Sequence, residues 1–160
     1  MLNTSDMMMQ TMTSNQPFEL RRRAVSLFRR EQQSGWMHRL AAFLRGECPA
    51  LDDLQQVNRS GRVRGSHYAG LQTVSLDAIQ GSEARTTDFD HHFHPRNARS
   101  LWRWVSIFQA RINEEALPPV ELIQVGGEYY VRDGHHRLSV AHALGEQFIE
   151  AEVTVWDLAR

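Results

Sequence analysis

The chain has 160 residues, of which 41% are hydrophobic and 23% charged, and its formal net charge is −1. This length and composition fit one globular domain, or a compact domain with an appended segment, and the charge excludes a protein that is basic overall. No apolar run reaches the roughly 18–20 residues of a membrane span, and the N-terminus lacks the order of a signal peptide.

Two residue counts limit the chemistry that the chain can perform. Cys48 is the only cysteine, which excludes an internal disulfide and leads us to expect a cytoplasmic protein. The sequence contains no lysine, so a P-loop lysine and a Schiff base are both excluded. Phosphate or carboxylate groups must therefore be recognised by arginine, histidine and backbone N–H groups.

The first 70 residues are predicted to lie outside the main domain. Residues 1–16 are polar and Met-rich, which predicts a disordered tail. Residues 17–70 are predicted to form a helical, Arg-rich extension with a short helix near Leu54 and a turn-rich connector, and a second long helix is expected to begin after Gly35. The helical surface carries Arg21, Arg22, Arg23, Arg29 and Arg30. These arginines form either a solvated face or an arm that binds DNA, anionic lipid or a protein partner.

Residues 71–160 are predicted to form a small mixed α/β (α+β) domain, because strand-like and helix-like periods alternate along them. The expected elements are a strand (71–76), a polar loop (79–95), a helix (98–112), two strands joined at Gly126-Gly127, a helix (134–144) and a closing strand (148–156). Within the first of these helices, Trp104 is assigned to the core and Trp102 to an interface or pocket wall.

The polar loop contains the sequence "DFDHHFHP", which offers Asp88, Asp90, His91, His92 and His94. Two histidines and a carboxylate are a known ligand set for a transition metal. Adjacent histidines on a loop lack the spacing of an established metal motif, so we assign no metal here and expect hydrogen-bonded loop structure or contact with the nucleotide.

The sequence "VRDGHHRLSVAHALG", residues 131–145, places a turn between a strand and a helix. Asp133 is expected to cap the helix, and Gly134 allows a sharp bend and the close approach of a ligand. We expect His135, His136 and Arg137 to face whatever binds at the helix start, where backbone N–H groups attract anions. The alternative is that Arg137 pairs with a carboxylate and the histidines form local hydrogen bonds.

Residues 118–155 resemble the ParB/sulfiredoxin-like superfamily, with its two hairpin strands, Gly-x-x-Arg turn, helix ending in Leu-Gly and final strand. In that superfamily the turn binds nucleotide phosphates. The resemblance therefore implies phosphate binding by Gly134, His135, His136 and Arg137, positioned by Asp133, with Arg85 reaching the phosphates from the opposite side. The implied cofactor is a nucleotide (ATP, ADP or CTP) with Mg²⁺.

The form Asp-Gly-His-His-Arg most resembles the free serine kinases of this superfamily. His135 stands where sulfiredoxins have their reactive cysteine, so reductase activity is disfavoured. The kinase resemblance implies a small-molecule kinase, with a small hydroxyl compound as substrate, or a nucleotide hydrolase; Glu83 would be the general base and His136 a second catalytic residue. Asp88 and Asp90 are further candidates for the base. The alternatives are a non-catalytic, nucleotide-responsive module that binds DNA or protein through the Arg-rich helices, and a ParB-like nuclease.

Overall fold

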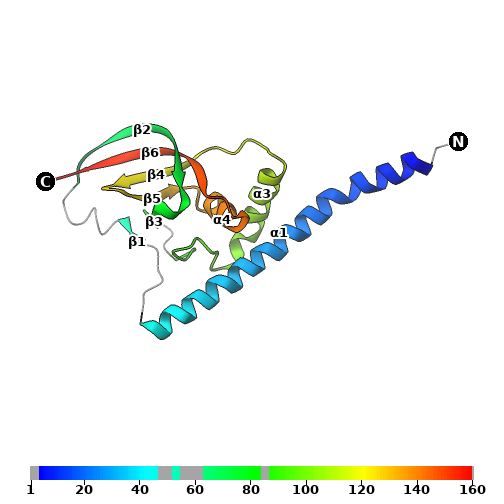
Figure 1. Ribbon diagram of the computed structural model, residues 1–160, viewed down its shortest axis with the longest axis horizontal. Helices are drawn as coiled ribbons and strands as arrows, with labels where there is room; N and C mark the ends of the chain where they lie inside the picture. The colour runs from blue at the N-terminus through cyan, green and yellow to red at the C-terminus, as the bar shows by residue number, and fades with distance from the viewer. Residues whose placement is uncertain (1–3, 47–51, 55–62, 84–86, 160) are drawn as a thin grey trace.

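The computed structural model describes residues 4–46, 52–54, 63–83 and 87–159. One long helix, α1 (Thr4–Arg45), runs past a domain of strands and short helices and projects beyond it at both ends (Figure 1). Within the described ranges, no helix combines the length and apolar composition that crossing a membrane requires.

The domain is built on a single mixed sheet. Its strands are β1 (Asp52–Asp53), β2 (Val63–Ser75), β3 (Ile79–Ser82), β4 (Val120–Val125), β5 (Glu128–Asp133) and β6 (Phe148–Leu158), in the spatial order β1-β3-β5-β4-β6-β2. Strand β3 is parallel to β1 and β5, and β4 is parallel to β6, whereas β4–β5 and β2–β6 are antiparallel. Together with the helices, this sheet confirms the predicted mixed α+β class.

Two strands lie where the sequence predicted other structure. Strand β2 begins at Val63, inside the expected connector, and pairs with β6 with register irregularities between Val63 and Gly65 and between Tyr68 and Gly70. Glycines and polar residues hide the strand period there, and β6 supplies the partner. Strand β3 occupies the first four residues of the expected loop 79–95, because it inserts as a central strand between β1 and β5.

In the segment before β2, two described residues lie in a strand instead of the predicted short helix, whereas Leu54 is helical. Asp52 and Asp53 form β1, and Leu54 is buried against Ile123 and Tyr130 on one face of the sheet. Cys48, Leu51 and Val57 lie outside the described residues.

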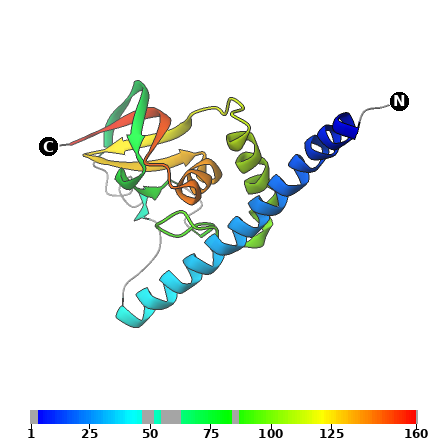
Figure 2. The same cartoon turned by 45° about the vertical axis from the view of Figure 1, so that its right-hand side comes forward.

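The three helices pack one against the next on one side of the sheet. Helix α4 (His135–Leu144) lies against the sheet, α3 (Leu101–Ile112) lies against α4, and α1 lies against α3 (Figure 2). The short 3-10 helices η1 (Leu76–Ala78) and η2 (Ala98–Ser100) precede β3 and α3. Helix α3 confirms the prediction for residues 98–112, and its Trp104 is buried while Trp102 is exposed.

Helix α4 packs on two sides, against the sheet and against the other helices, and each side belongs to a separate hydrophobic cluster. Leu138 and Ala141 pack with Leu122 and Val153 of the sheet. On the opposite side, Val140 packs in a second cluster, whose other buried members are Ala24, Phe28, Trp104, Val105 and Phe108. The Trp104 indole Nε1 donates a hydrogen bond to Ser139 Oγ at 3.0 Å, so the polar atoms between the two helices are paired.

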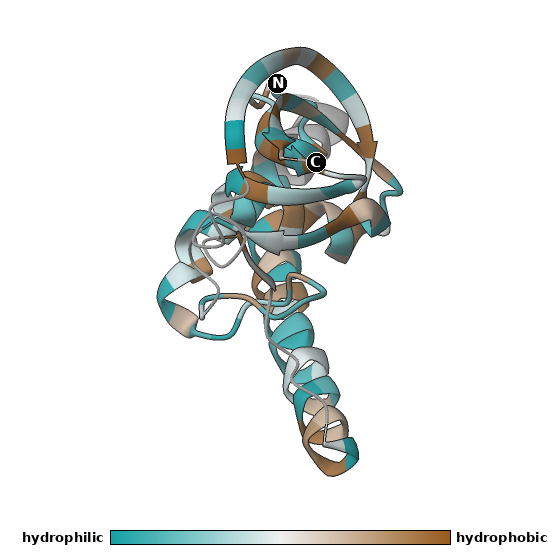
Figure 3. Ribbon diagram, turned by 90° about the vertical axis from the view of Figure 1, so that its left-hand side faces the viewer, coloured by the Kyte–Doolittle hydropathy of each residue, from teal (hydrophilic) through white to brown (hydrophobic). Residues whose placement is uncertain are grey.

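Helix α1 differs from its prediction at both ends. It begins at Thr4, within the expected disordered tail, and it continues through Gly35, where a second helix was expected to start. Extending an existing helix needs no new nucleation, so a polar sequence can continue one that is anchored elsewhere. Its C-terminal end carries exposed hydrophobic side chains beyond the domain, including Phe43 and Leu44 (Figure 3).

Gly35 is the point where α1 meets the histidine-rich loop, residues 88–95, which is the C-terminal part of the predicted polar loop. A Cβ atom at this position would lie 2.7 Å from His94 Cβ and 2.9 Å from Asp90 Oδ2. The glycine is therefore a close-contact residue of the packed helix rather than a helix end.

We expect Gly35→Ala to destabilise the protein by about 1–3 kcal/mol through overpacking, although alanine is the better helix former by about 1 kcal/mol. Urea unfolding measures the change, with Gln33→Ala on the exposed side of α1 as the control. A Gly35→Ala protein that is more stable than the wild type would contradict this contact.

Candidate functional site

The turn between β5 and α4 depends on the backbone of Gly134. This residue has a left-handed φ of 99° and occupies the helix cap, without a side-chain capping hydrogen bond. A Cβ atom there would lie 2.6 Å from Val120 Cγ1. Asp133, predicted as the cap, is instead the last residue of β5. That prediction is wrong because the chain makes the turn one residue later, at Gly134, with a left-handed backbone conformation that only glycine adopts without strain.

Arg137 is held in place by three acceptors. Its Nη1 donates to the backbone carbonyls of Pro118 and Pro119, the latter at 2.8 Å. Its Nη2 donates to Asp133 Oδ2 at 2.7 Å. The Arg137 side chain is 14% exposed, so the guanidinium is fixed beside the start of α4. The ion pair between Arg137 and Asp133 agrees with the alternative prediction, in which Arg137 pairs with a carboxylate.

The two histidines of the turn are buried instead of facing outward. His135 Nε2 and Ser82 Oγ are hydrogen-bonded at 2.6 Å, which ties α4 to the end of β3. The Phe89 ring stacks with the His135 ring at 5.9 Å and meets the His136 ring edge-on at 5.2 Å. The polar loop thus covers the first turn of α4, a tertiary contact that the local sequence does not reveal.

A small hollow nevertheless lies at the start of α4. Its volume is about 30 Å³, and it is lined by residues 133–137 of the turn together with Arg103 and Ile107 of α3. The hollow is thus lined by the five consecutive residues Asp133, Gly134, His135, His136 and Arg137, and packing of α3 adds Arg103. An exposed arginine on an amphipathic helix looks like ordinary surface in the sequence, so no local signal marks Arg103; only the packing of α3 on α4 does.

A larger pocket of about 360 Å³ lies next to the hollow and shares Arg137 and Ile107 with it. Its apolar lining includes Leu117, Val140 and Phe148. Its polar lining includes Arg111 and Glu146, which form a two-point ion pair at 2.8 and 2.7 Å. The hydrogen bond with Glu146 raises the pKa of Arg111, so this side of the pocket keeps a charged pair.

The predicted acidic residues lie apart from the hollow. Glu83 directly follows β3, and its carboxylate accepts a hydrogen bond from Arg132 Nε at 3.0 Å. Asp88 accepts a hydrogen bond from the Asn97 amide at 3.2 Å. Neither residue lines the hollow. Arg85 lies outside the described residues.

Asp90 is a buried anchor of the histidine-rich loop. Its Oδ1 accepts hydrogen bonds from the backbone N–H groups of His92 and His94, at 3.1 and 2.9 Å, and lies 3.1 Å from His94 Nδ1. Burial alone would raise the pKa of Asp90, but the hydrogen bonds and the charge of His94 lower it below its ordinary value. Asp90 therefore stabilises the loop as a carboxylate, and its role is structural.

We expect Ser82→Ala to destabilise the protein by about 1–3 kcal/mol, because it removes a hydrogen-bond partner from the buried His135 ring. Thermal or urea unfolding measures the loss. Ser106→Ala is the matched control, since Ser106 is exposed on α3 and its hydroxyl donates to the Trp102 carbonyl within the same helix. Equal stability of the two variants would show that the Ser82–His135 bond contributes nothing.

Comparison with known proteins gives little beyond this geometry. No family model and no curated protein matches the chain. Among solved structures, the chain is similar to the crystal structure of sulfiredoxin from Arabidopsis thaliana, with 19% identity and a TM-score of 0.41, over 52% of this chain and 82% of that one. This likeness is too weak to indicate what the site does. The mixed α+β class follows from the sheet and helices of the chain itself.

Proposed function

We propose that this protein binds the phosphates of a nucleotide at the start of α4. The observation that supports this most strongly is the hollow that Arg103 and Arg137 share with the turn 133–137. Helix α4 has neither a side-chain cap nor an acidic residue in its first turn, and the Asp133 carboxylate beside the hollow is paired with Arg137, so no side-chain anion caps the positive end of the helix dipole. Arginine forks beside a helix start are a suitable environment for phosphate oxygens.

The neighbouring pocket supports a ligand larger than phosphate. Its volume of about 360 Å³ falls at the lower end of the range for small-molecule sites, roughly 300–1,000 Å³. An apolar wall with a charged pair at one side suits a base or another flat group, while Arg137, shared with the hollow, lies between the two spaces. We expect Mg²⁺ to accompany the nucleotide, since it neutralises adjacent phosphate oxygens.

A phosphotransferase or nucleotide hydrolase is the function that we assign to this site. Arg103 and the start of α4 would stabilise the negative charge of a transferred phosphoryl group. Glu83 is the proposed general base toward a small hydroxyl compound or water, which would have to lie between Glu83 and the hollow, because Glu83 does not line the hollow itself. Its carboxylate is paired with Arg132, so it must leave this partner or act beside it. His136, which lines the hollow, is the second catalytic candidate.

A non-catalytic, nucleotide-responsive module is the second candidate, and an arginine-lined groove on α1 favours it. Arg21, Arg22, Arg29 and Arg30 line this groove with Phe18. The Arg21 guanidinium lies 4.7 Å from the centre of the exposed Trp102 ring, which fixes its position on the surface. Such a row of cations suits DNA or an acidic protein surface.

Binding is tested by calorimetric titration of ATP, ADP and CTP, each with Mg²⁺. We expect Arg103→Ala to weaken binding about 10-fold or more, because a charge-assisted hydrogen bond to phosphate contributes about 1.5–3 kcal/mol. Arg99→Ala is the matched control, since Arg99 is exposed on η2 and does not line the hollow. Arg137→Ala should abolish binding. Absence of binding by the folded wild type would refute the proposal.

Turnover separates the two candidate functions. We expect Glu83→Gln to lower nucleotide turnover at least 10-fold while the affinity stays unchanged, since a general base contributes roughly 10²–10⁴-fold to a rate. Glu121→Gln, an exposed carboxylate on β4, is the control. Nucleotide binding without turnover, with or without small hydroxyl acceptors, would favour the regulatory module instead.

A further inference from the structure

The junction between α1 and the histidine-rich loop gathers three imidazole rings. The ring centre of His38, on α1, lies 5.4 Å from that of His92 and 5.5 Å from that of His94. The His92 and His94 centres are 5.9 Å apart. Three imidazoles on one zinc ion, with Zn–N distances of about 2.0–2.1 Å, have ring centres roughly 5–5.5 Å apart. The triangle thus has nearly the dimensions of a three-histidine metal site.

His94 already has the orientation of a metal ligand. Its Nδ1 lies 3.1 Å from Asp90 Oδ1 and 3.2 Å from Asp90 Oδ2, so the ring N–H on this side donates to the carboxylate. In metal sites a carboxylate holds a histidine in this way, and the opposite nitrogen binds the ion. That opposite nitrogen, Nε2, faces Glu31 Oε2 of α1 at 3.5 Å.

A cation on the His94 Nε2 side, either a second ring proton or a metal ion, would make the contact between this nitrogen and Glu31 favourable. When Nδ1 carries the ring proton, Nε2 presents a lone pair to a carboxylate oxygen, and two acceptors do not attract each other. Their separation is longer than a direct N–H···O bond of about 2.7–3.2 Å. It is close to the roughly 3.3 Å between two ligands of one tetrahedral zinc ion. Both side chains are mostly buried, with 13% and 17% exposed, so bulk water screens this contact weakly.

We propose that Glu31, His38, His92 and His94 bind a zinc ion that joins α1 to the loop. One carboxylate and three imidazoles are a ligand set that zinc accepts. Among the described residues, no group of three or more His, Cys, Asp or Glu side chains is placed to hold a metal ion without rearrangement. The site therefore closes by rotation of His38 and His92, which are both exposed, around the fixed His94. The sequence analysis assigned no metal here because two of the ligands lie on a helix more than 50 residues away.

The surroundings of the site fit a structural ion. Glu31 and His38 are two helical turns apart on α1, with Gly35 between them, and the absence of a Cβ at Gly35 lets His94 approach the helix. Arg39 Nη1 lies 3.6 Å from Asp90 Oδ2, so the Asp90 carboxylate faces both Arg39 and His94 Nδ1. Binding would add a cross-link between α1 and the loop.

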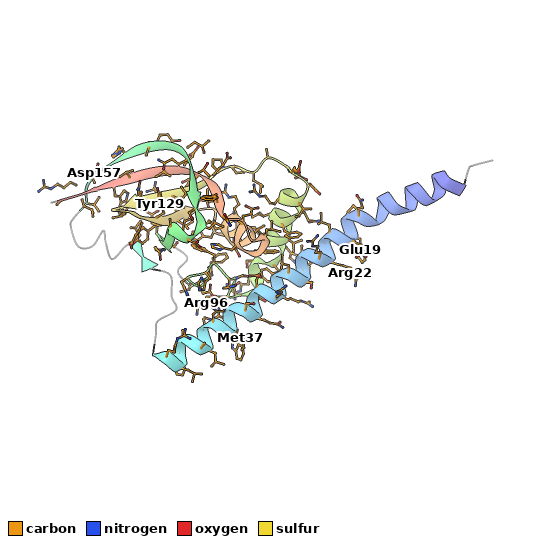
Figure 4. The ribbon with its side chains drawn as sticks, viewed as in Figure 1. Glu19, Arg22, Met37, Arg96, Tyr129 and Asp157 are labelled. Carbon is orange, nitrogen blue, oxygen red and sulfur yellow. The ribbon has the colours of Figure 1, made fainter. Side chains whose placement is uncertain are left out.

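The test uses the full-length protein, stripped with EDTA and titrated with Zn²⁺ by calorimetry and by thermal melting. We expect one zinc ion per chain and a rise in Tm. His38→Ala and Glu31→Gln should each weaken zinc binding about 10-fold or more while the proteins stay folded. His67→Ala is the matched control, since His67 is exposed and pairs with Asp157 at the far end of the sheet (Figure 4).

Failure of the folded wild type to bind stoichiometric zinc would overturn the proposal, and a proton on His94 Nε2 would then be the cation that Glu31 faces. Undiminished binding in both His38→Ala and Glu31→Gln would overturn it as well. So would loss of binding in His67→Ala, because the ion would then lie elsewhere. None of these outcomes depends on nucleotide binding at α4.

Discussion

The close approach of Gly134 to Val120 determines where α4 lies, and most of the structure depends on that position. Because no Cβ separates the turn from β4, the chain leaves β5 and bends directly back onto the sheet. Leu138 then meets the sheet core while Val140 faces α3. The same closeness brings Arg137 within reach of the carbonyls of Pro118 and Pro119, which lead into β4.

Helices α3 and α1 are positioned in turn by their contacts with α4 and with each other. Ser139 on α4 accepts the Trp104 indole hydrogen bond, and the Trp104 ring packs edge-on against Phe28 of α1 at 5.6 Å. Helix α3 is thus positioned from both sides, and this positioning puts Arg103 at the hollow. The proposed anion site is therefore assembled by helix packing, although most of its residues belong to one short turn.

Local sequence signals predicted the parts of the fold that are set by neighbouring residues. The Gly126-Gly127 hairpin, helix α3 with its buried Trp104, and the end of α4 at Gly145 are of this kind. Strand β2 before residue 71 was missed because its partner β6 lies about 85 residues away. The burial of His135 and His136 and the contribution of Arg103 were missed for the same reason, since each depends on elements that meet only in the folded chain.

Strand β2 forms one edge of the sheet, and its irregular register affects how the protein behaves at high concentration. Thirteen residues of strand at an edge present a row of backbone groups to which another sheet could add. The two irregularities, one of them beside Gly70 with its left-handed φ of 88°, twist this edge and interrupt the row. This interruption of the row disfavours edge-to-edge pairing with another sheet, although Tyr68 and Leu71 are exposed there.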